Sequence, residues 1–196
     1  MAGLRYTRFT MTTPTADSPA AAPAPPLYVG HQALVTRVLQ HVMNPLNRHA
    51  LALTGQPGIG RTALLQHCAR IFDSSVVVVS LSLNSIDFRD EAAWLHQLHE
   101  ATMAALEGLE VARSRLDWVP APADASALRD WLRNAFLPEY MRVIRSHRRL
   151  AWLFDDADAL LQAIERGALP ADHLEFLHTL LQAQPQASLV LALDIK

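Results

Sequence analysis

The stretch LALTGQPGIGRTALL, residues 51–65, decides the fold class. It begins with a short apolar run and continues into a glycine-rich segment whose fixed positions are Gly55, Gly60 and Thr62. Beyond the glycines, apolar residues recur at the spacing of one helix face, which predicts a helix that begins close to Thr62. A buried strand, a glycine-rich turn and a helix thus follow each other, the order needed for a loop that wraps a phosphate chain.

The glycine-rich segment fits G-x-x-x-x-G-K-[ST] at every fixed position except the lysine, where Arg61 stands. Such a loop needs glycine because its backbone N–H groups point inward at positive φ values. The hydroxyl of Thr62 is expected to bind Mg²⁺, and the N-terminus of the following helix adds partial positive charge. A plain turn is the alternative, which the flanking strand and helix disfavour. The predicted nucleotide-binding residues of the loop are Gly55, Gln56, Pro57, Gly58, Ile59, Gly60, Arg61, Thr62 and Ala63.

Strand and helix patterns alternate along the rest of the chain. Strands are predicted over the apolar runs at 49–55, 76–84 and 187–196, and over the run that ends in Asp155. Helically spaced apolar residues lie between them, with a break or restart expected at Pro138. This alternation predicts one α/β domain with a parallel sheet, helices on both faces, and a ligand site at the carboxyl ends of the strands.

Two acids follow the predicted strand LAWLF. Four apolar residues and an acid are typical of the strand that binds Mg²⁺ in nucleotide hydrolases, so Asp155 is expected to hold the metal, directly or through water. Asp156 is expected to orient and polarise the attacking water. Two solvated acids at a strand end are the alternative. Asn84, at the end of another strand, is a weaker candidate for a contact with the catalytic acid.

Three stretches, TGQPGIGRTALL, LAWLFDDADALL and LYVGHQALVTRVL, together resemble the AAA+ and STAND ATPases, which belong to the ASCE division of P-loop proteins. The resemblance covers residues 28–194 and implies ATP and Mg²⁺ as ligands. It implies that Val29 and Gly30 help to enclose the adenine, although His31 departs from the usual arginine. The paired acids favour the STAND group. The family sheet has the order 5-1-4-3-2, so we expect four strands in the order 1-4-3-2, with the fifth strand and the helical lid missing.

Two positions depart from the family pattern. Arg61 replaces a lysine that bridges the β- and γ-phosphates in the family, and arginine is longer, planar and forked. Phosphate binding is expected to persist, whereas hydrolysis should be slow or absent. Asp194 stands where relatives have a polar sensor residue, and its carboxylate would repel a γ-phosphate unless the metal or Arg61 intervenes.

The missing fifth strand has a consequence for association. If the fourth strand inserts between the first and the third, the first strand becomes a sheet edge made of apolar residues. Such an edge pairs readily with other strands. We therefore expect that the chain belongs to a longer polypeptide, or that it persists by pairing with a protein partner or a second copy.

The composition is that of a globular protein, with 196 residues of which 51% are hydrophobic, and a formal net charge of −2. This charge gives no global reason to expect nucleic acid or membrane binding, and no uncharged apolar run reaches the roughly 18 residues that span a bilayer. Residues 1–26 are expected to form a disordered leader rich in Pro and Ala, with a transit peptide as the alternative, and residues 27–196 the ATPase domain. The single Cys68 indicates a buried thiol and a reducing, cytoplasmic setting.

Two clusters carry weaker signals. The first is a cluster of four arginines, for which a solvated helix end is expected, with a DNA-facing patch as the alternative. His96 and His99 form the second, at a spacing that a metal could use, but no third ligand fits the pattern. The arginines of the first cluster are Arg142, Arg145, Arg148 and Arg149.

These observations predict an ATP-binding regulatory switch with weak or no hydrolysis, in which Asp156 and Arg61 are the catalytic residues. Two alternatives remain open: a catalytically dead nucleotide-binding scaffold, and a DNA-associated ATPase of the initiator-loading or transposition-helper type.

Overall fold

The computed structural model of the chain describes residues 32–106, 120–144 and 148–194. Within these residues, helices surround one four-stranded sheet whose strands are β1 (Leu51–Gly55), β2 (Val76–Ser82), β3 (Arg149–Asp155) and β4 (Ala187–Asp194). The α-helices are α1 (Gln32–Met43), α2 (Arg61–Ile71), α3 (Glu91–Ala104), α4 (Ala125–Trp131), α5 (Leu137–Val143), α6 (Asp158–Glu165) and α7 (His173–Ala183). The short helical segments are η1 (Leu83–Ser85), a 3-10 turn, and η3 (Leu132–Phe136), a π-helix.

The strands are parallel and lie in the order β1-β4-β3-β2, which confirms the predicted fold class and strand order. The register pairs Gly55 with Asp194 and Ser82 with Asp155, so the carboxyl ends of the strands reach one edge of the sheet. The glycine-rich loop, Asp194 and Asp155, far apart in sequence, therefore lie along that edge.

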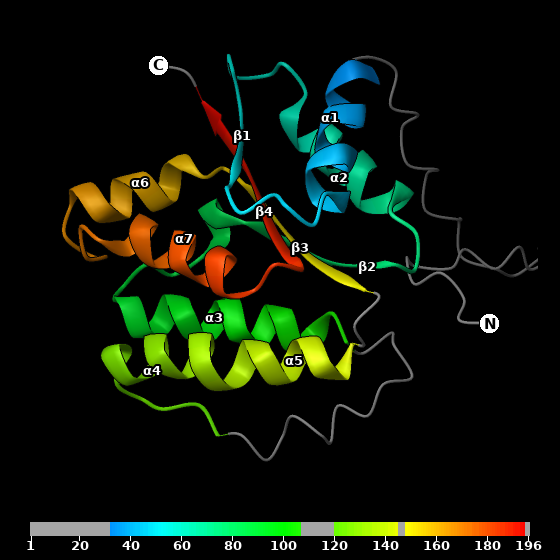
Figure 1. Cartoon of the computed structure of the whole chain (residues 1–196). Helices are drawn as coiled ribbons and strands as arrows, with labels where there is room; N and C mark the ends of the chain where they lie inside the picture. The colour runs from blue at the N-terminus through cyan, green and yellow to red at the C-terminus, as the bar shows by residue number, and fades with distance from the viewer. Residues whose placement is uncertain (1–31, 107–119, 145–147, 195–196) are drawn as a thin grey trace, which may run out of the picture.

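Helices cover both faces of the sheet, as predicted (Figure 1). On the face of α1 and α2, the core includes Val38 and Cys68, both fully buried. On the face of α3, α5 and α7, Trp94 and Tyr140 are fully buried. Removing such a large apolar side chain from water contributes about 1.5–3 kcal/mol, so each layer is fixed to the sheet by its own core.

β1 forms one edge of the sheet in the described part of the chain, pairing with β4 alone. Leu53 and Gly55 are buried, whereas the alternate residues Ala52 and Thr54 are exposed. This confirms the predicted sheet edge of apolar residues. Such a strand carries no charged side chain that would discourage pairing with another strand.

Pro138 marks a restart inside a helical stretch, as predicted. The π-helical segment η3 ends at Phe136, and α5 begins at Leu137 with the proline in its first turn. Proline lacks an N–H and cannot donate to the preceding turn, so it fits best where the hydrogen-bond pattern changes.

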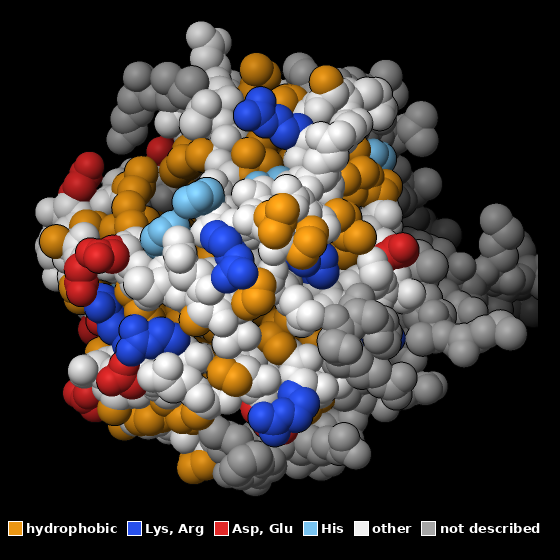
Figure 2. All heavy atoms as spheres, in the orientation of Figure 1, with side chains coloured by type: hydrophobic (Ala, Val, Ile, Leu, Met, Phe, Trp, Pro, Cys, Tyr) orange, Lys and Arg blue, Asp and Glu red, His pale blue; other side chains and the backbone are white. Residues whose placement is uncertain are grey.

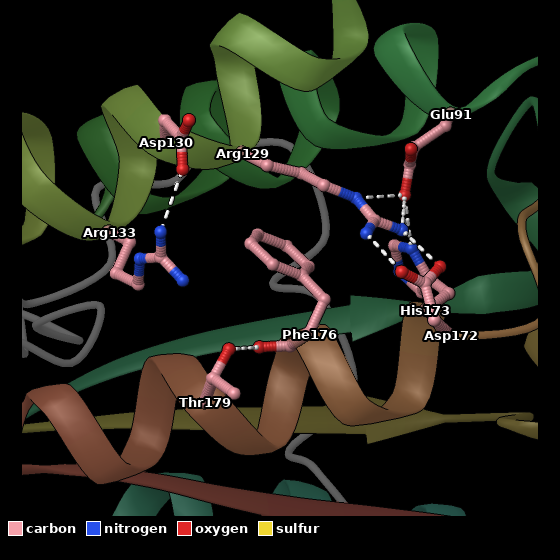
Figure 3. A network of polar contacts seen from close by, with 8 residues as sticks. All are labelled: Glu91, Arg129, Asp130, Arg133, Asp172, His173, Phe176 and Thr179. Carbon is pink, nitrogen blue, oxygen red and sulfur yellow. Dashed lines mark hydrogen bonds and ion pairs between the residues drawn. The ribbon is translucent and has the colours of Figure 1, made fainter.

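A buried polar network joins α3, α4 and α7 on the face of the sheet that α3, α5 and α7 cover (Figure 3). Oε1 of Glu91 accepts hydrogen bonds from Arg129 Nε at 2.8 Å and Nη2 at 2.6 Å, and lies 2.7 Å from Nδ1 of His173. Trp94 donates its indole N–H to Nε2 of His173 at 2.8 Å, which leaves the imidazole proton on Nδ1. Asp172 binds the outer side of the Arg129 guanidinium at 2.9 Å. The network fixes the beginnings of α3 and α7 relative to α4.

Cys68 is buried, as expected, and burial raises the pKa of its thiol to about 11. None of the helices in the described ranges is long and apolar enough to cross a bilayer. The leader predicted at residues 1–26 lies outside the described residues.

Candidate functional site

The glycine-rich loop connects β1 to α2 at the carboxyl edge of the sheet. Gly58 and Gly60 have φ values of 80° and 94°, a region that other residues rarely adopt. Gly55 has no positive φ, but a Cβ there would lie 3.0 Å from the Ile59 side chain. α2 begins at Arg61 and has no side-chain cap, so its first N–H groups remain available to an anion.

Most residues of the loop and the first turn of α2 face solvent. Gln56, Pro57 and Ile59 are exposed, and so are Thr62 and Ala63 in the first turn of α2. The hydroxyl of Thr62 is therefore accessible to a ligand. The structure brings all the predicted loop residues together.

The Arg61 side chain is bonded to the ends of β1 and β4. Its Nη2 forms an ion pair with Oδ1 of Asp194, and its Nη1 donates to the carbonyl oxygens of Gly55 and Leu193. The side chain is 16% exposed. The guanidinium thus links the ends of β1 and β4. Of the two expected ways to offset the Asp194 charge, a metal or Arg61, the structure shows Arg61.

Asp155 and Asp156 lie at the end of β3 and are both half-buried. Asp156 has a φ of 55°, the left-handed region, which is uncommon for a residue with a side chain. Its N–H donates to Oδ1 of Asp155 at 3.1 Å, and its Oδ2 accepts a hydrogen bond from Ser82 Oγ at 3.0 Å. The backbone turn and the hydroxyl together fix the direction of the Asp156 carboxylate.

Sequence reasoning missed Ser82 and considered Asn84 instead. Asn84 lies in the 3-10 turn η1 and is exposed, whereas Ser82 is the last residue of β2, opposite Asp155 in the register. The available signal was the end of the β2 strand pattern, because parallel neighbours bring their last residues together.

A hollow of about 250 Å³ adjoins the loop on the side of α1. Leu34 and Arg37 of α1 form one wall, and Ile59 and Leu64 form another. The edge strand β1 lines the hollow as well. Its largely apolar walls, with Arg37 and Arg61 at the lining and the glycine-rich loop beside it, suit a flat, partly polar group such as a nucleobase.

The residues present fit Mg²⁺ as a ligand shared with a nucleotide. In the described part of the chain, no three His, Cys, Asp or Glu residues gather as a metal site of their own. Mg²⁺ ordinarily keeps several waters and is held through one or two carboxylates plus phosphate oxygens. A single carboxylate at Asp155 and a hydroxyl at Thr62 match that donor set.

The predicted solvated arginine cluster is wrong for two of its members. Arg148 and Arg149 are 9% and 8% exposed, and Arg149 begins β3. Its Nε donates to the carbonyl of Val42 and its Nη2 to that of Pro185 at 3.1 Å. The carbonyls at the end of α1 lack helical partners, and the Arg149 guanidinium supplies donors there.

The structure describes one of the other two arginines of the cluster. Arg142 is paired with Glu139 at 2.5 Å, and Arg145 lies outside the described residues. In Figure 2 the visible Lys and Arg side chains are dispersed and form no continuous stripe on this face. Acidic side chains gather along the left edge, where α6 and the beginnings of α3 and α4 lie.

His99 packs against aromatic side chains of the core. Its ring lies edge-on to Phe136 at 4.6 Å and to Trp131 at 5.0 Å, and burial lowers its pKa. Val29 and Gly30, predicted to lie near the adenine, fall outside the described residues, so that prediction is not tested.

Among curated proteins, no sequence matches the chain. A family model described as "AAA domain" matches residues 46–194, which include the glycine-rich loop, the acid pair and all four strands. AAA domains are nucleotide-binding, ATPase-type domains that generally use ATP and Mg²⁺. The chain belongs to this family and contains an AAA-type P-loop ATPase domain.

Proposed function

We propose that the chain binds ATP with Mg²⁺ at the β1–α2 loop and acts as a nucleotide-dependent regulatory switch with slow or no hydrolysis. The observation that carries the proposal is the position of Arg61. The loop and the start of α2 are open to a phosphate chain, while the cation of the loop is paired with Asp194. This arrangement supports nucleotide binding and leaves no unpaired loop cation to stabilise the transition state.

The proposed binding roles follow the positions of the residues. Backbone N–H groups between Gly55 and Ala63 hold the phosphates, and the hollow beside Leu34 and Ile59 takes the base. Val29 and Gly30 would complete the enclosure of the base, as the family resemblance implies. Thr62 and Asp155 would hold Mg²⁺, which when bound neutralises phosphate charge.

The proposed chemistry depends on Asp156 and Arg61. Asp156 would orient the attacking water, with its carboxylate held by Ser82. Arg61 would have to leave Asp194 before it could donate to the transferred phosphoryl group. Loss of one aimed transition-state donor lowers the rate about 10²- to 10³-fold, which supports slow turnover.

A route for the regulatory output starts at Ser82. This residue contacts Asp156 and leads directly into η1 and α3. Helices α3–α5 connect β2 to β3 in the chain. A change at Asp156 can therefore be passed to the helices on the face of the sheet that α3, α5 and α7 cover. Within the described residues β1 pairs on one side only, and its other side is the proposed site for a protein partner or a second copy.

The catalytically dead scaffold remains the second candidate, favoured by the same Arg61–Asp194 pair. The third candidate, a DNA-associated ATPase, keeps only part of the arginine cluster that suggested it. Arg148 and Arg149 are buried, and Arg149 is bonded to backbone carbonyls.

Steady-state ATPase assays of the wild-type chain and Arg61→Lys separate the first two candidates. A lysine restores a compact ammonium, so we expect the rate to rise by one to two orders of magnitude, about 10- to 100-fold. Arg70→Lys, at an exposed position later in α2, is the matched control and should leave the rate unchanged. Activity absent in both forms, with nucleotide still bound, would support the scaffold instead.

A further inference from the structure

Asp194 ends β4, between the glycine-rich loop and the acid pair. β4 lies between β1 and β3 in the sheet, and the register pairs Gly55 with Asp194. The loop is therefore on one side of Asp194 and the Asp155–Asp156 pair on the other. A triphosphate that reaches from the loop to a metal at the acid pair must bring its γ-phosphate close to Asp194, whereas a diphosphate ends at the loop.

The cation of the loop is already neutralised. Arg61 is ion-paired with Asp194 and donates to the carbonyls of Gly55 and Leu193, with only 16% of its side chain exposed. The side chain of Asp194 is 37% exposed, so solvent screens this carboxylate only in part. A phosphate that approaches Arg61 therefore meets a cation whose charge a neighbouring carboxylate has balanced.

A second carboxylate reinforces the negative character of this edge. Oδ2 of Asp158 accepts the backbone N–H of Asp194 at 2.7 Å, which fixes the end of β4 against the start of α6. Asp155 and Asp156 lie at the end of the neighbouring strand. Carboxylates thus border the end of β4, while the neighbouring loop and the start of α2 offer backbone N–H groups.

We infer that Asp194 makes this site favour nucleoside diphosphates over triphosphates, an inference that rests on the proposed nucleotide binding. A diphosphate uses the loop and leaves the Arg61–Asp194 pair intact. A triphosphate either sets its γ-phosphate against the Asp194 carboxylate or draws Arg61 away and leaves that carboxylate unpaired. Both outcomes weaken triphosphate binding. The resting form of the switch is then the diphosphate complex.

Isothermal titration calorimetry with Mg²⁺ and either ADP or the β,γ-imido analogue of ATP tests the inference, since the analogue cannot be hydrolysed to ADP. We expect the wild-type chain to bind ADP about tenfold more tightly, a ratio set by a modest difference in binding free energy. In Asp194→Asn the analogue should bind about tenfold more tightly than in wild type, which brings the ratio close to one.

Two variants control for charge and structure. Glu165→Gln removes an exposed carboxylate at the far end of α6 and should leave the ratio unchanged. Asp194→Glu keeps the charge and should keep the preference for ADP. If Asp194→Asn does not fold by circular dichroism, Asp194→Ser removes the same charge with a smaller side chain.

The outcomes separate this inference from the proposed function. A wild-type chain that binds the analogue as tightly as ADP, or a ratio that does not move in the neutral variants, overturns the preference and leaves nucleotide binding established. If neither nucleotide binds to any folded form, the proposed function fails and the preference fails with it.

Discussion

Ser82 and Asp156 are joined by a hydrogen bond of 3.0 Å, although 74 residues separate them in the sequence. The bond connects the last residue of β2 to the residue that follows β3, and Asp156 is held there with a φ of 55°. A carboxylate fixed by both its backbone and a neighbouring hydroxyl has little freedom to rotate. We expect Ser82 to act as a positioning residue for Asp156.

Removal of this hydroxyl should affect turnover and spare binding. In an Arg61→Lys background, Ser82→Ala should lower kcat roughly tenfold because a misdirected base loses alignment with the water, with the nucleotide Kd unchanged. Ser82→Thr should restore most of the rate. Ser80→Ala, two residues earlier on the exposed side of β2, is the matched control. Equal losses in Kd and kcat would indicate a structural role only.

The Glu91 network should dominate the stability of the second helical layer. Glu91→Ala leaves Arg129 and His173 without their shared acceptor, and breaking a buried ion pair from one side costs about 3–5 kcal/mol. Asp130→Ala breaks the exposed Asp130–Arg133 pair seen in the same view, at a cost of at most about 1 kcal/mol (Figure 3). Urea denaturation measures both, and similar losses would show that the network is not a stability centre.

The stability of the fold should fall in mildly acidic solution. Burial lowers the pKa of His173, and the pKa values of His41 and His99 are lowered by the same cause. The unfolded chain therefore binds protons below about pH 6.5 that the folded chain does not yet bind, so the free energy of unfolding decreases as the pH falls from there.

Denaturation at a series of pH values measures this loss, and NMR titration assigns it. The imidazole of His173 should titrate below the ordinary histidine range, with its proton on Nδ1 in the neutral form. A midpoint at or above about 6.5 would contradict the expected direction.

Much of the fold could be predicted because its signals are local. The apolar run before Gly55, the glycines after it and the acids after Phe154 each occupy a few neighbouring positions, and parallel α/β topology follows from their alternation with helices. The order β1-β4-β3-β2 came from the family resemblance and agrees with the structure.

The misses concern contacts made across the sheet. Ser82 reaches Asp156 because two parallel strands end side by side, and a sequence pattern does not fix that register to one residue. Arg149 was expected in solvent, but its side chain is buried and donates a hydrogen bond to a carbonyl at the end of α1. The Glu91–His173 contact joins residues 82 positions apart, so no short pattern contains it.

Thermal unfolding with ATP and Mg²⁺ tests the central claim most directly. At a ligand concentration of 100 times Kd, binding stabilises the fold by about 2.7 kcal/mol, which raises Tm by roughly 5–10 °C. Gly60→Ala strains the loop at a φ of 94°, and Gly167→Ala imposes similar strain at a φ of 76° far from it. We predict a shift in Tm that needs both ATP and Mg²⁺. The Gly167→Ala variant should keep this shift, and the Gly60→Ala variant should lose it. No shift at millimolar ligand, or the same shift in both variants, would contradict nucleotide binding at this loop.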